Sequence, residues 1–197
     1  WASIAEGGAA NELLAQAAKM ASEISSKKVV RQPVAVANYA KLAAAAGRAA
    51  PRLHTMARAL VEAAGGKYHE GPIKGEKRCA EKVASDYGGD FGRVIDCVRG
   101  SGEFEKPGQM LDALKKLDTK ASPLSVVRFK DRLGRPTGSG YRDLLINVRV
   151  AAPGREAAKA REMHICELQL HLTELKELKP RVHDIYDIMR TLDGLVG

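Results

Sequence analysis

The sequence predicts an α+β protein in which helices flank a mixed β-sheet. Residues 1–66 are rich in Ala, with apolar side chains recurring near helical spacing. Further along, several short β-branched runs are bounded by Gly, Pro and Ser clusters, which is typical of strands and their connections. Three strands in a row after a single crossover helix favour a mixed or antiparallel sheet. We therefore expect a helical N-terminal segment at 1–66 and a main domain at 67–197.

The N-terminal segment is predicted to contain three helices. Apolar residues at helical spacing predict the first of them between Ala9 and Lys27. Pro33 is suited to the first turn of a second helix, and Pro51 is expected to divide the remaining Ala-rich stretch into two. Gly65 and Gly66 would end it. No residue of this segment suggests chemistry, so we expect it to cover the main domain or to bind a protein partner.

The next part of the chain is predicted to alternate between loops, helices and one strand. Residues 67–74 should form a loop, followed by a helix from Gly75 to Tyr87. A strand is expected from Val94 to Phe104, with Asp96 near its start. An amphipathic helix should then run from Pro107 to Leu117, because its apolar residues share one helical face.

The stretch from Val126 to Val150 is predicted to form two strands joined by a long loop rich in Gly and Arg. In the second strand, alternation places one set of side chains on a core face and another on a face that can line a cleft. The core set is Leu144, Ile146, Val148 and Val150, and the other is Asp143, Leu145, Asn147 and Arg149. Tyr141 lies where the loop becomes a strand, with cations on both sides, and could stack on a flat ligand.

A last strand is expected from Met163 to Leu170, in which Glu167 and Gln169 share the polar face with His171 just beyond it. Two helices, at 172–178 and 181–192, would close the chain. Between the last two strands, Pro153 and Gly154 should begin a polar connection.

Composition favours anionic partners. The formal net charge is +8 and the pI is about 9.5, which suits nucleotides, RNA or acidic membranes, although a solvated basic surface would give the same balance. The 3 Cys are widely spaced and fit neither a disulfide framework nor a zinc site, so we expect reduced, buried thiols. No apolar run is long enough to span a bilayer, and no signal peptide is visible. Because the chain begins at Trp1, we expect a piece of a longer protein.

The polar faces of the predicted strands bring several charged side chains within reach of one cleft. Asp96 and Glu167 are candidates for holding Mg²⁺, which prefers few carboxylates together with phosphate oxygens. Candidates for neutralising phosphates are Lys74, Arg78, Lys82, Arg99 and Lys130. The first three of these follow at intervals of four residues and share one helix face, although a solvated basic face has the same pattern. No Walker A loop and no G-x-G-x-x-G segment is present, so a nucleotide site would be of another type.

Four segments in order resemble RelA/SpoT-type nucleotide synthetase domains. Lys130-Asp131, Pro136 and Gly140-Tyr141-Arg142 look like that family's K-D-Y…P-K-x-N-G-Y-R-S segment. Residues 164–171, HICELQLH, are similar to its E-[IV]-Q-[IL]-R strand. Asp96 follows a basic helix as the family's magnesium-binding aspartate does, and Lys74 and Lys82 match its paired ATP-gripping residues. The order and spacing agree over roughly residues 67–192.

The resemblance implies a fold, a reaction and roles for individual residues. The family's domain moves pyrophosphate from ATP to a ribose hydroxyl, so residues 67–197 would be a magnesium-dependent catalytic domain. Carried over, Asp96 and Glu167 would bind the metal, with Gln169 beside them in the catalytic group. The basic residues would bind ATP. Acceptor binding would fall to Tyr141, Arg142, Asp143 and His171.

The sequence also departs from the family pattern. The Lys before N-G-Y is Thr137 or Gly138 here, the Ser-Leu-His after Tyr-Arg is residues 143–145, DLL, and His171 replaces an Arg. These differences leave the acceptor, either a nucleotide or RNA, and the donor open. Some members of the family are toxin domains that act on RNA by pyrophosphate or ADP-ribose transfer. A toxin-type RNA-modifying transferase with another donor, and a catalytically silent nucleotide- or RNA-binding module, are the alternatives. We expect a cytoplasmic site of action, with delivery as part of a longer effector as one route.

Overall fold

The structure, a computed structural model, describes residues 7–24, 29–151 and 163–177. The predicted connection at Pro153-Gly154 and the predicted closing helix at 181–192 lie outside the described residues. Among the residues that are described, no helix combines the length and the hydropathy needed to cross a membrane.

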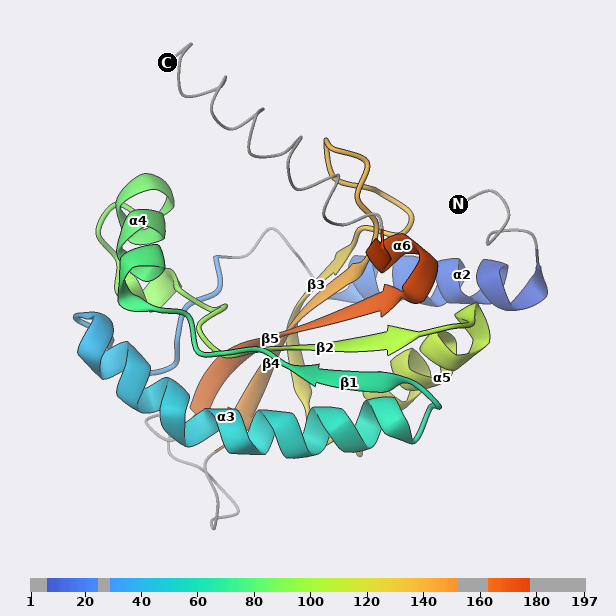
Figure 1. Cartoon of the computed structure of the whole chain (residues 1–197), viewed down its shortest axis with the longest axis horizontal. Helices are drawn as coiled ribbons and strands as arrows, with labels where there is room; N and C mark the ends of the chain where they lie inside the picture. The colour runs from blue at the N-terminus through green and yellow to red at the C-terminus, as the bar shows by residue number, and fades with distance from the viewer. Residues whose placement is uncertain (1–6, 25–28, 152–162, 178–197) are drawn as a thin grey trace.

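A five-stranded mixed sheet forms the centre of the molecule, in the order β1-β2-β5-β4-β3 (Figure 1). β2 and β5 pair in parallel, and the other three neighbouring pairs are antiparallel. The strands are β1 (Lys67–Glu70), β2 (Arg99–Phe104), β3 (Ser125–Asp131), β4 (Leu144–Ala151) and β5 (Met163–Leu172). The predicted α+β class with a mixed sheet is therefore confirmed.

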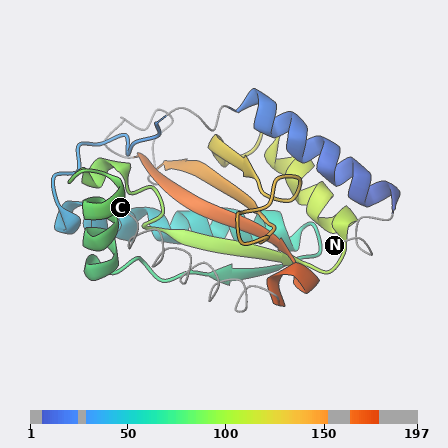
Figure 2. The same ribbon diagram turned by 90° about the horizontal axis from the view of Figure 1, so that it is seen from above.

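Three helices cover one face of this sheet, so the core is a layer between helices and strands. They are α2 (Gly8–Glu23), α3 (Tyr39–Glu62) and α5 (Pro107–Leu117), and α3 runs beneath β1, β2, β5 and β4. Helix α4 (Glu76–Asp86) stands at one end of the sheet, preceding the 3-10 turn η1 (Phe91–Arg93), and the short α6 (Thr173–Glu177) follows β5. Seen from above, no described helix crosses the opposite face of the sheet, and the β3–β4 loop lies in front of it (Figure 2). We call this face the open face.

The core follows from alternation in the strands and small residues in the helices. Leu144, Ile146, Val148 and Val150 are all fully buried, as predicted for the core face of β4. Helix α3 meets the sheet through buried alanines, including Ala46, Ala49, Ala50 and Ala57. These small side chains let the helix axis lie close to the strands. The described part of residues 1–66 thus shares one hydrophobic core with the sheet.

Helix α3 lies close to β2 because two positions of that strand lack side chains. A Cβ at Gly102 would lie 2.6 Å from Val61 Cγ2, and a Cβ at Gly100 would lie 2.0 Å from the hydroxyl oxygen of Tyr68. Both separations are far below van der Waals contact. Glycine at these positions is therefore required by the close approach of α3 and β1 to the core face of β2.

Two predictions about the N-terminal helices are wrong. Pro51 does not split the second stretch, because α3 continues through it for 24 residues. Pro51 is exposed, so the Gly47 carbonyl that loses its partner can be hydrated, while Leu53 and the alanines hold the opposite side against the core. Pro33 does not open a helix either. Helix α3 begins after Asn38, whose side chain accepts a hydrogen bond from the Lys41 amide at 3.1 Å.

Two strand predictions also need correction. Residues 67–70, predicted as loop, form the edge strand β1. The strand is held by main-chain hydrogen bonds to β2, and its polar sequence lacks the apolar alternation that would have predicted it. The strand predicted from Val94 begins only at Arg99, so Asp96 lies in an irregular segment before β2. The amide groups of this segment bond to other elements, with Val98 O accepting from Glu167 N at 2.9 Å.

Candidate active site

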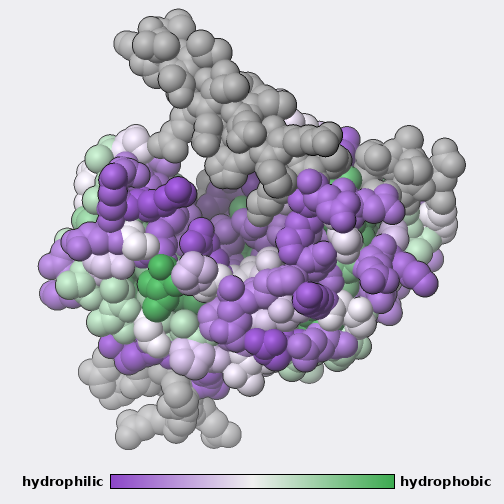
Figure 3. Space-filling model, viewed as in Figure 1, coloured by the Kyte–Doolittle hydropathy of each residue, from purple (hydrophilic) through white to green (hydrophobic). Residues whose placement is uncertain are grey.

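The open face of the sheet carries rows of polar side chains. Because directly paired residues point to the same face, strand register places Arg128, Asn147, Glu167 and Arg99 in one row. The next row contains Lys130, Leu145, Gln169, Ser101 and His69. Hydrophilic side chains surround a hollow beside α4 in the space-filling view (Figure 3). The sheet thus brings together residues that are up to a hundred positions apart in the sequence.

Two lysines bond to Asp96 at one end of the cleft that is lined by these polar side chains. Lys74 Nζ and Lys82 Nζ donate to the same oxygen, Asp96 Oδ2, at 2.5 and 2.8 Å. The other oxygen, Oδ1, is buried and has no hydrogen-bond partner among the described residues. Burial would raise the pKa of Asp96, but the charges of Lys82 and Lys74 outweigh it and lower that pKa. The aspartate is therefore ionised and presents one unpaired oxygen.

Glu167 lies on β5 next to this aspartate. Burial, followed by the negative charge of Asp96, raises the pKa of Glu167. Gln169 Nε2 donates to Glu167 Oε1 at 2.9 Å. Both residues line a pocket of ≈ 410 Å³ together with Arg99 and β1 residues such as His69 and Glu70.

The donor set at this end of the cleft fits a divalent cation bound together with phosphate. The described residues contain no group of three or more Asp, Glu, His or Cys arranged to enclose a metal. Mg²⁺ needs no such cage, since it commonly takes one or two carboxylates and completes its shell with water and phosphate oxygens. Asp96 Oδ1 lacks a partner among the described residues, and burial followed by the negative charge of Asp96 raises the pKa of Glu167. A cation between the two carboxylates would relieve both unfavourable features.

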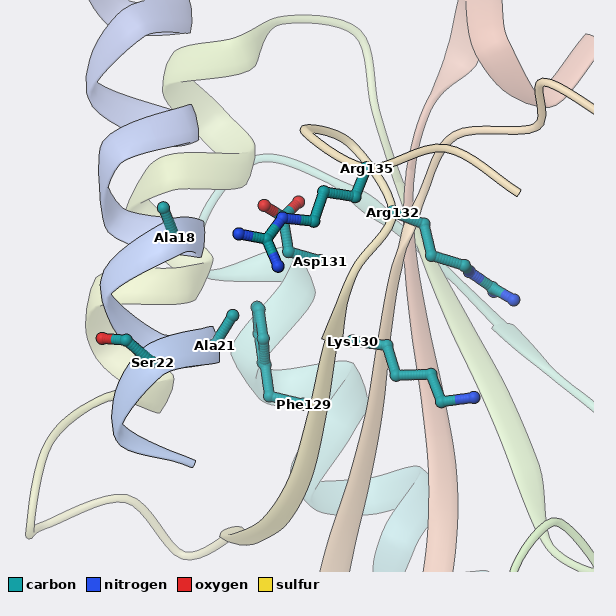
Figure 4. A pocket seen from close by; sticks show the side chains of 8 residues that line it. All are labelled: Ala18, Ala21, Ser22, Phe129, Lys130, Asp131, Arg132 and Arg135. Atoms are coloured by element: carbon teal, nitrogen blue, oxygen red, sulfur yellow. The ribbon is translucent and has the colours of Figure 1, made fainter. Parts of the chain in front are cut away.

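Lys130 reaches the same face from the outer strand β3. Figure 4 shows the side chains of Lys130 and Arg132 pointing away from α2, whereas Asp131 and Arg135 point towards it. Burial and then the neighbouring charges of Arg128 and Arg132 lower the pKa of Lys130, while Glu167 opposes that shift. A second cavity of ≈ 350 Å³ lies against α2 around Phe129 and Asp131. It opens on the helix side of β3 and contains none of the carboxylates of the cleft.

The other end of the cleft holds a connected network of side chains. Arg132 donates from Nε to Asp143 Oδ1 at 2.5 Å and from a terminal nitrogen to Asp143 Oδ2 at 2.6 Å. Asp143 Oδ2 also lies 3.9 Å from His171 Nδ1, which in turn lies 2.8 Å from the Tyr141 hydroxyl. Asp143 and His171 are buried, and Tyr141 is half-buried. Burial and the nearby Asp143 raise the pKa of Tyr141, so its hydroxyl stays protonated.

The structure brings most of the predicted site residues together, with two qualifications. Arg78 is exposed on α4 and takes no part in the Asp96 cluster. Arg142 donates to the Leu133 carbonyl and so braces the β3–β4 loop. Sequence reasoning missed Arg132 as a partner of Asp143. Its position two residues after Lys130 was the available signal, because alternation puts both on one face.

The three cysteines are free and buried, as predicted. Burial raises the pKa of the Cys97 thiol to about 12 and that of Cys79 in the same direction. These thiols are therefore packing groups beside the site rather than nucleophiles.

Comparisons with solved structures give the fold a context. No protein-family model matches the sequence, and a sequence search of curated proteins gives no significant match. Small alarmone synthetase 2 from Bacillus subtilis superposes with a TM-score of 0.61 at 14% identity, over 78% of this chain and 82% of that one. Small alarmone synthetase 1 from the same organism, bound to its product pppGpp, gives 0.59 at 13% identity over 75% and 81%.

A third structure, a GTP pyrophosphokinase family protein from Streptococcus pneumoniae, gives a TM-score of 0.54 at 15% identity over 72% of each chain. At such identities the likeness concerns the fold and not the chemistry. The expected RelA/SpoT-like architecture is confirmed: the chain has the fold of the alarmone synthetases and GTP pyrophosphokinases.

Proposed function

We propose that this chain is a magnesium-dependent transferase that moves pyrophosphate from ATP to a ribose hydroxyl of a nucleotide or RNA acceptor. The observation that carries the proposal is the pair formed by Asp96 and Glu167, with Lys74 and Lys82 fixing Asp96. The pair lies beside a sheet whose fold is shared with a GTP pyrophosphokinase family protein and with small alarmone synthetases.

In the proposed reaction, an acceptor ribose oxygen bonds to the β-phosphorus of ATP. The bond between that phosphorus and the oxygen bridging to the α-phosphate breaks, AMP leaves with the electron pair, and the hydroxyl proton passes to a base or to solvent. Positioning and charge neutralisation account for most of catalysis in phosphoryl transfer. Lys82, Lys130 and Arg99 supply positive charge on the face where the triphosphate would lie.

The two carboxylates would hold Mg²⁺, which supplies Lewis-acid stabilisation of phosphate oxygens when bound. Glu167 has its pKa raised by burial and by Asp96, so before metal binding it is the more easily protonated of the two and can accept a proton. Gln169 holds one Glu167 oxygen by a hydrogen bond and so restricts rotation of the carboxylate.

The opposite end of the cleft would bind the acceptor. Tyr141 offers an aromatic ring at the loop–strand junction, and a base stacked on such a ring gains about 1–3 kcal/mol. The network through His171 and Asp143 holds the ring in place, and the loop itself is braced by Arg142.

The test is to incubate the protein with ATP labelled at the γ-phosphate, Mg²⁺ and a panel of acceptors that includes GTP, GDP, ATP, ADP and total tRNA. Pyrophosphate transfer yields one AMP per labelled acceptor, with a mass gain corresponding to two phosphates. Transfer of a single phosphate would release ADP instead, and ADP-ribosylation would require NAD⁺ and leave the ATP label unchanged. If ATP binds but none of these products forms, even in a parallel incubation with NAD⁺, the silent binding module is the correct alternative.

A further inference from the structure

We propose that Gln32, from the segment between α2 and α3, is a positioning residue that fixes the Asp96 segment against β5 and so sets the separation of the two carboxylates. This inference rests on the proposed function for its catalytic meaning, but the contacts it uses are structural. Gln32 touches neither carboxylate, so it acts through the main chain that carries them.

The Gln32 side chain bonds to both segments at once. Its Nε2 donates to Val94 O at 2.9 Å and to Ile165 O at 3.1 Å, and its Oε1 accepts from Ile165 N at 2.9 Å. Val94 and Ile165 each lie two positions before a carboxylate of the pair. The Gln32 main-chain amide donates to Gly92 O at 2.7 Å as well. Gln32 is only 7% exposed, so these bonds lie in surroundings where losing them is costly.

A second buried amide repeats this arrangement one residue closer to the carboxylates. Asn147 Nδ2 lies 3.4 Å from Ile95 O and 3.4 Å from Cys166 O, and each of those residues directly precedes Asp96 or Glu167. Asn147 is also the cross-strand partner of Glu167. Its two bonds are longer than those of Gln32, so it supports the same junction more weakly.

Together, Gln32 and Asn147 join the irregular segment that contains Asp96 to β5, at a point where the two are not paired by a regular β-ladder. The β2–β5 pairing begins only at Arg99, and the Val98 O to Glu167 N bond is the last main-chain link before it. Without Gln32, the stretch from Val94 to Cys97 would keep two main-chain bonds, in which the Val94 amide donates to Phe91 O and the Lys74 amide donates to Cys97 O. Neither of these bonds ties the stretch to β5, so the weaker Asn147 contact would remain for that. Groups that orient metal-binding side chains commonly change metal affinity by about 10–100-fold when removed.

The test replaces Gln32 with Met, which preserves the length of the side chain and removes its hydrogen bonds. The control is Gln109→Met, because the Gln109 side chain also donates to one main-chain carbonyl, Gly65 O at 3.0 Å, and accepts from one amide, Lys106 N at 3.0 Å, far from the cleft. Asn147→Leu provides a second variant of the junction should Gln32→Met not fold.

Two readouts are measured on the full chain. Hydrogen exchange follows the amides of Glu167 and Lys74, whose bonds end on the Asp96 segment. Electron paramagnetic resonance gives the dissociation constant of Mn²⁺, alone and with α,β-methylene-ATP. We expect Gln32→Met to accelerate exchange of both amides at least tenfold and to weaken Mn²⁺ binding about tenfold, with Asn147→Leu smaller in the same direction and Gln109→Met unchanged.

Unchanged amide exchange in Gln32→Met relative to Gln109→Met would overturn the positioning role, whatever the enzyme does. Faster exchange with unaltered Mn²⁺ binding would overturn it too, because the segment would then move without affecting the carboxylates. Failure of the proposed function is recognised separately: the wild-type chain would neither bind Mn²⁺ in the cleft nor release AMP, and the exchange data would still decide whether Gln32 holds the segment.

Discussion

The two ends of the cleft satisfy their polar groups in different ways. At the Asp96 end, a buried carboxylate oxygen lacks a partner among the described residues, as does the buried Nε of Arg99. At the Tyr141 end, Arg132, Asp143, His171 and Tyr141 form a continuous chain of contacts. One strand connects them, since Glu167 and His171 are four residues apart on β5, roughly 13 Å.

This difference indicates that the two ends bind in different ways. At the Asp96 end, the Asp96 oxygen and the Arg99 nitrogen without partners among the described residues can bond to a charged ligand. The Tyr141 end is satisfied without a ligand, so it offers a preformed surface, and little ordering is needed when an acceptor binds. Substitutions should therefore affect charge-dependent chemistry at the first end and affinity or stability at the second.

The largest effect should come from the carboxylates. Glu167→Gln keeps the shape and the hydrogen bond to Gln169 while removing the charge, and it should lower kcat by about a hundredfold or more, because charged groups at a reacting centre contribute on that scale. Asp96→Asn should behave alike. Initial rates of AMP release measure both. The control is Asp118→Asn, which should transfer pyrophosphate normally. Its carboxylate is also held by a lysine, Lys19, but it lies at the C-terminal end of α5 and bonds to α2. Near wild-type rates in both cleft variants would mean that the metal assignment is wrong.

The lysines that grip Asp96 come next. Lys82→Ala and Lys74→Ala should each weaken ATP binding by about tenfold, which titration calorimetry can measure. Arg78→Ala tests the same helix from an exposed position. Because salt screens exposed charges more than buried ones, the Arg78 effect should vanish at high salt while part of the Lys82 effect persists. Identical salt dependence in all three variants would show that the lysines act only through the general field of a basic surface.

At the other end, Tyr141→Ala should reduce acceptor affinity on the order of tenfold, because a stacked base loses its platform. Tyr141→Phe should keep most activity, since it removes one hydrogen bond to His171 and retains the ring. For an RNA acceptor, wild-type binding should also fall steeply with salt, and a free nucleotide should show a shallower dependence. If Tyr141→Ala loses thermal stability but binds its acceptor as before, the ring is a packing residue.

The smallest effect on chemistry, but a measurable one on stability, concerns His164 at the Asp96 end of β5. Burial lowers its pKa from 6.5 to about 4, so the folded state holds it neutral. The contribution of His164 to the free energy of unfolding should be fully present above pH 6.5. It should fall by roughly 3 kcal/mol as the pH decreases to 4, because His164 binds a proton at a higher pH in the unfolded chain than in the folded one. Urea unfolding at several pH values measures the slope. His164→Gln should flatten it.

The sequence predicted most strongly those elements whose pattern reflects burial. Helix α5 has the predicted bounds, and the core face of β4 matches residue for residue, because apolar periodicity is a direct consequence of packing. Strand β1 has no such pattern. Its four residues, KYHE, form an edge strand that is held by pairing with β2, and only Tyr68 is buried.

The candidate site could be predicted only in part from the sequence, because some of its contacts depend on tertiary packing and leave no local pattern. Charge and alternation suggested Asp96, Glu167 and the lysines, and the fold brings them together. The role of Gln32 could not be inferred, since a polar residue before a proline gives no sign that its amide reaches β5, more than 130 positions away. The start of β2 was misplaced because the apolar run at Val94 is buried by tertiary contacts rather than by a strand ladder.

Two glycines of β2, Gly100 and Gly102, restrict substitution on the helix-covered face of the sheet. At Gly100 a methyl group would overlap the Tyr68 side chain, and at Gly102 it would overlap Val61, so in each case a buried neighbour would have to shift. Directly opposite, on the other surface of the same strand, Arg99 and Ser101 line the pocket. A library of substitutions along β2 should therefore alternate between tolerated and intolerable positions. Changes of ligand preference through β2 are therefore expected at Arg99 and Ser101. At Gly100 and Gly102, on the core side of the same strand, there is no room for a side chain.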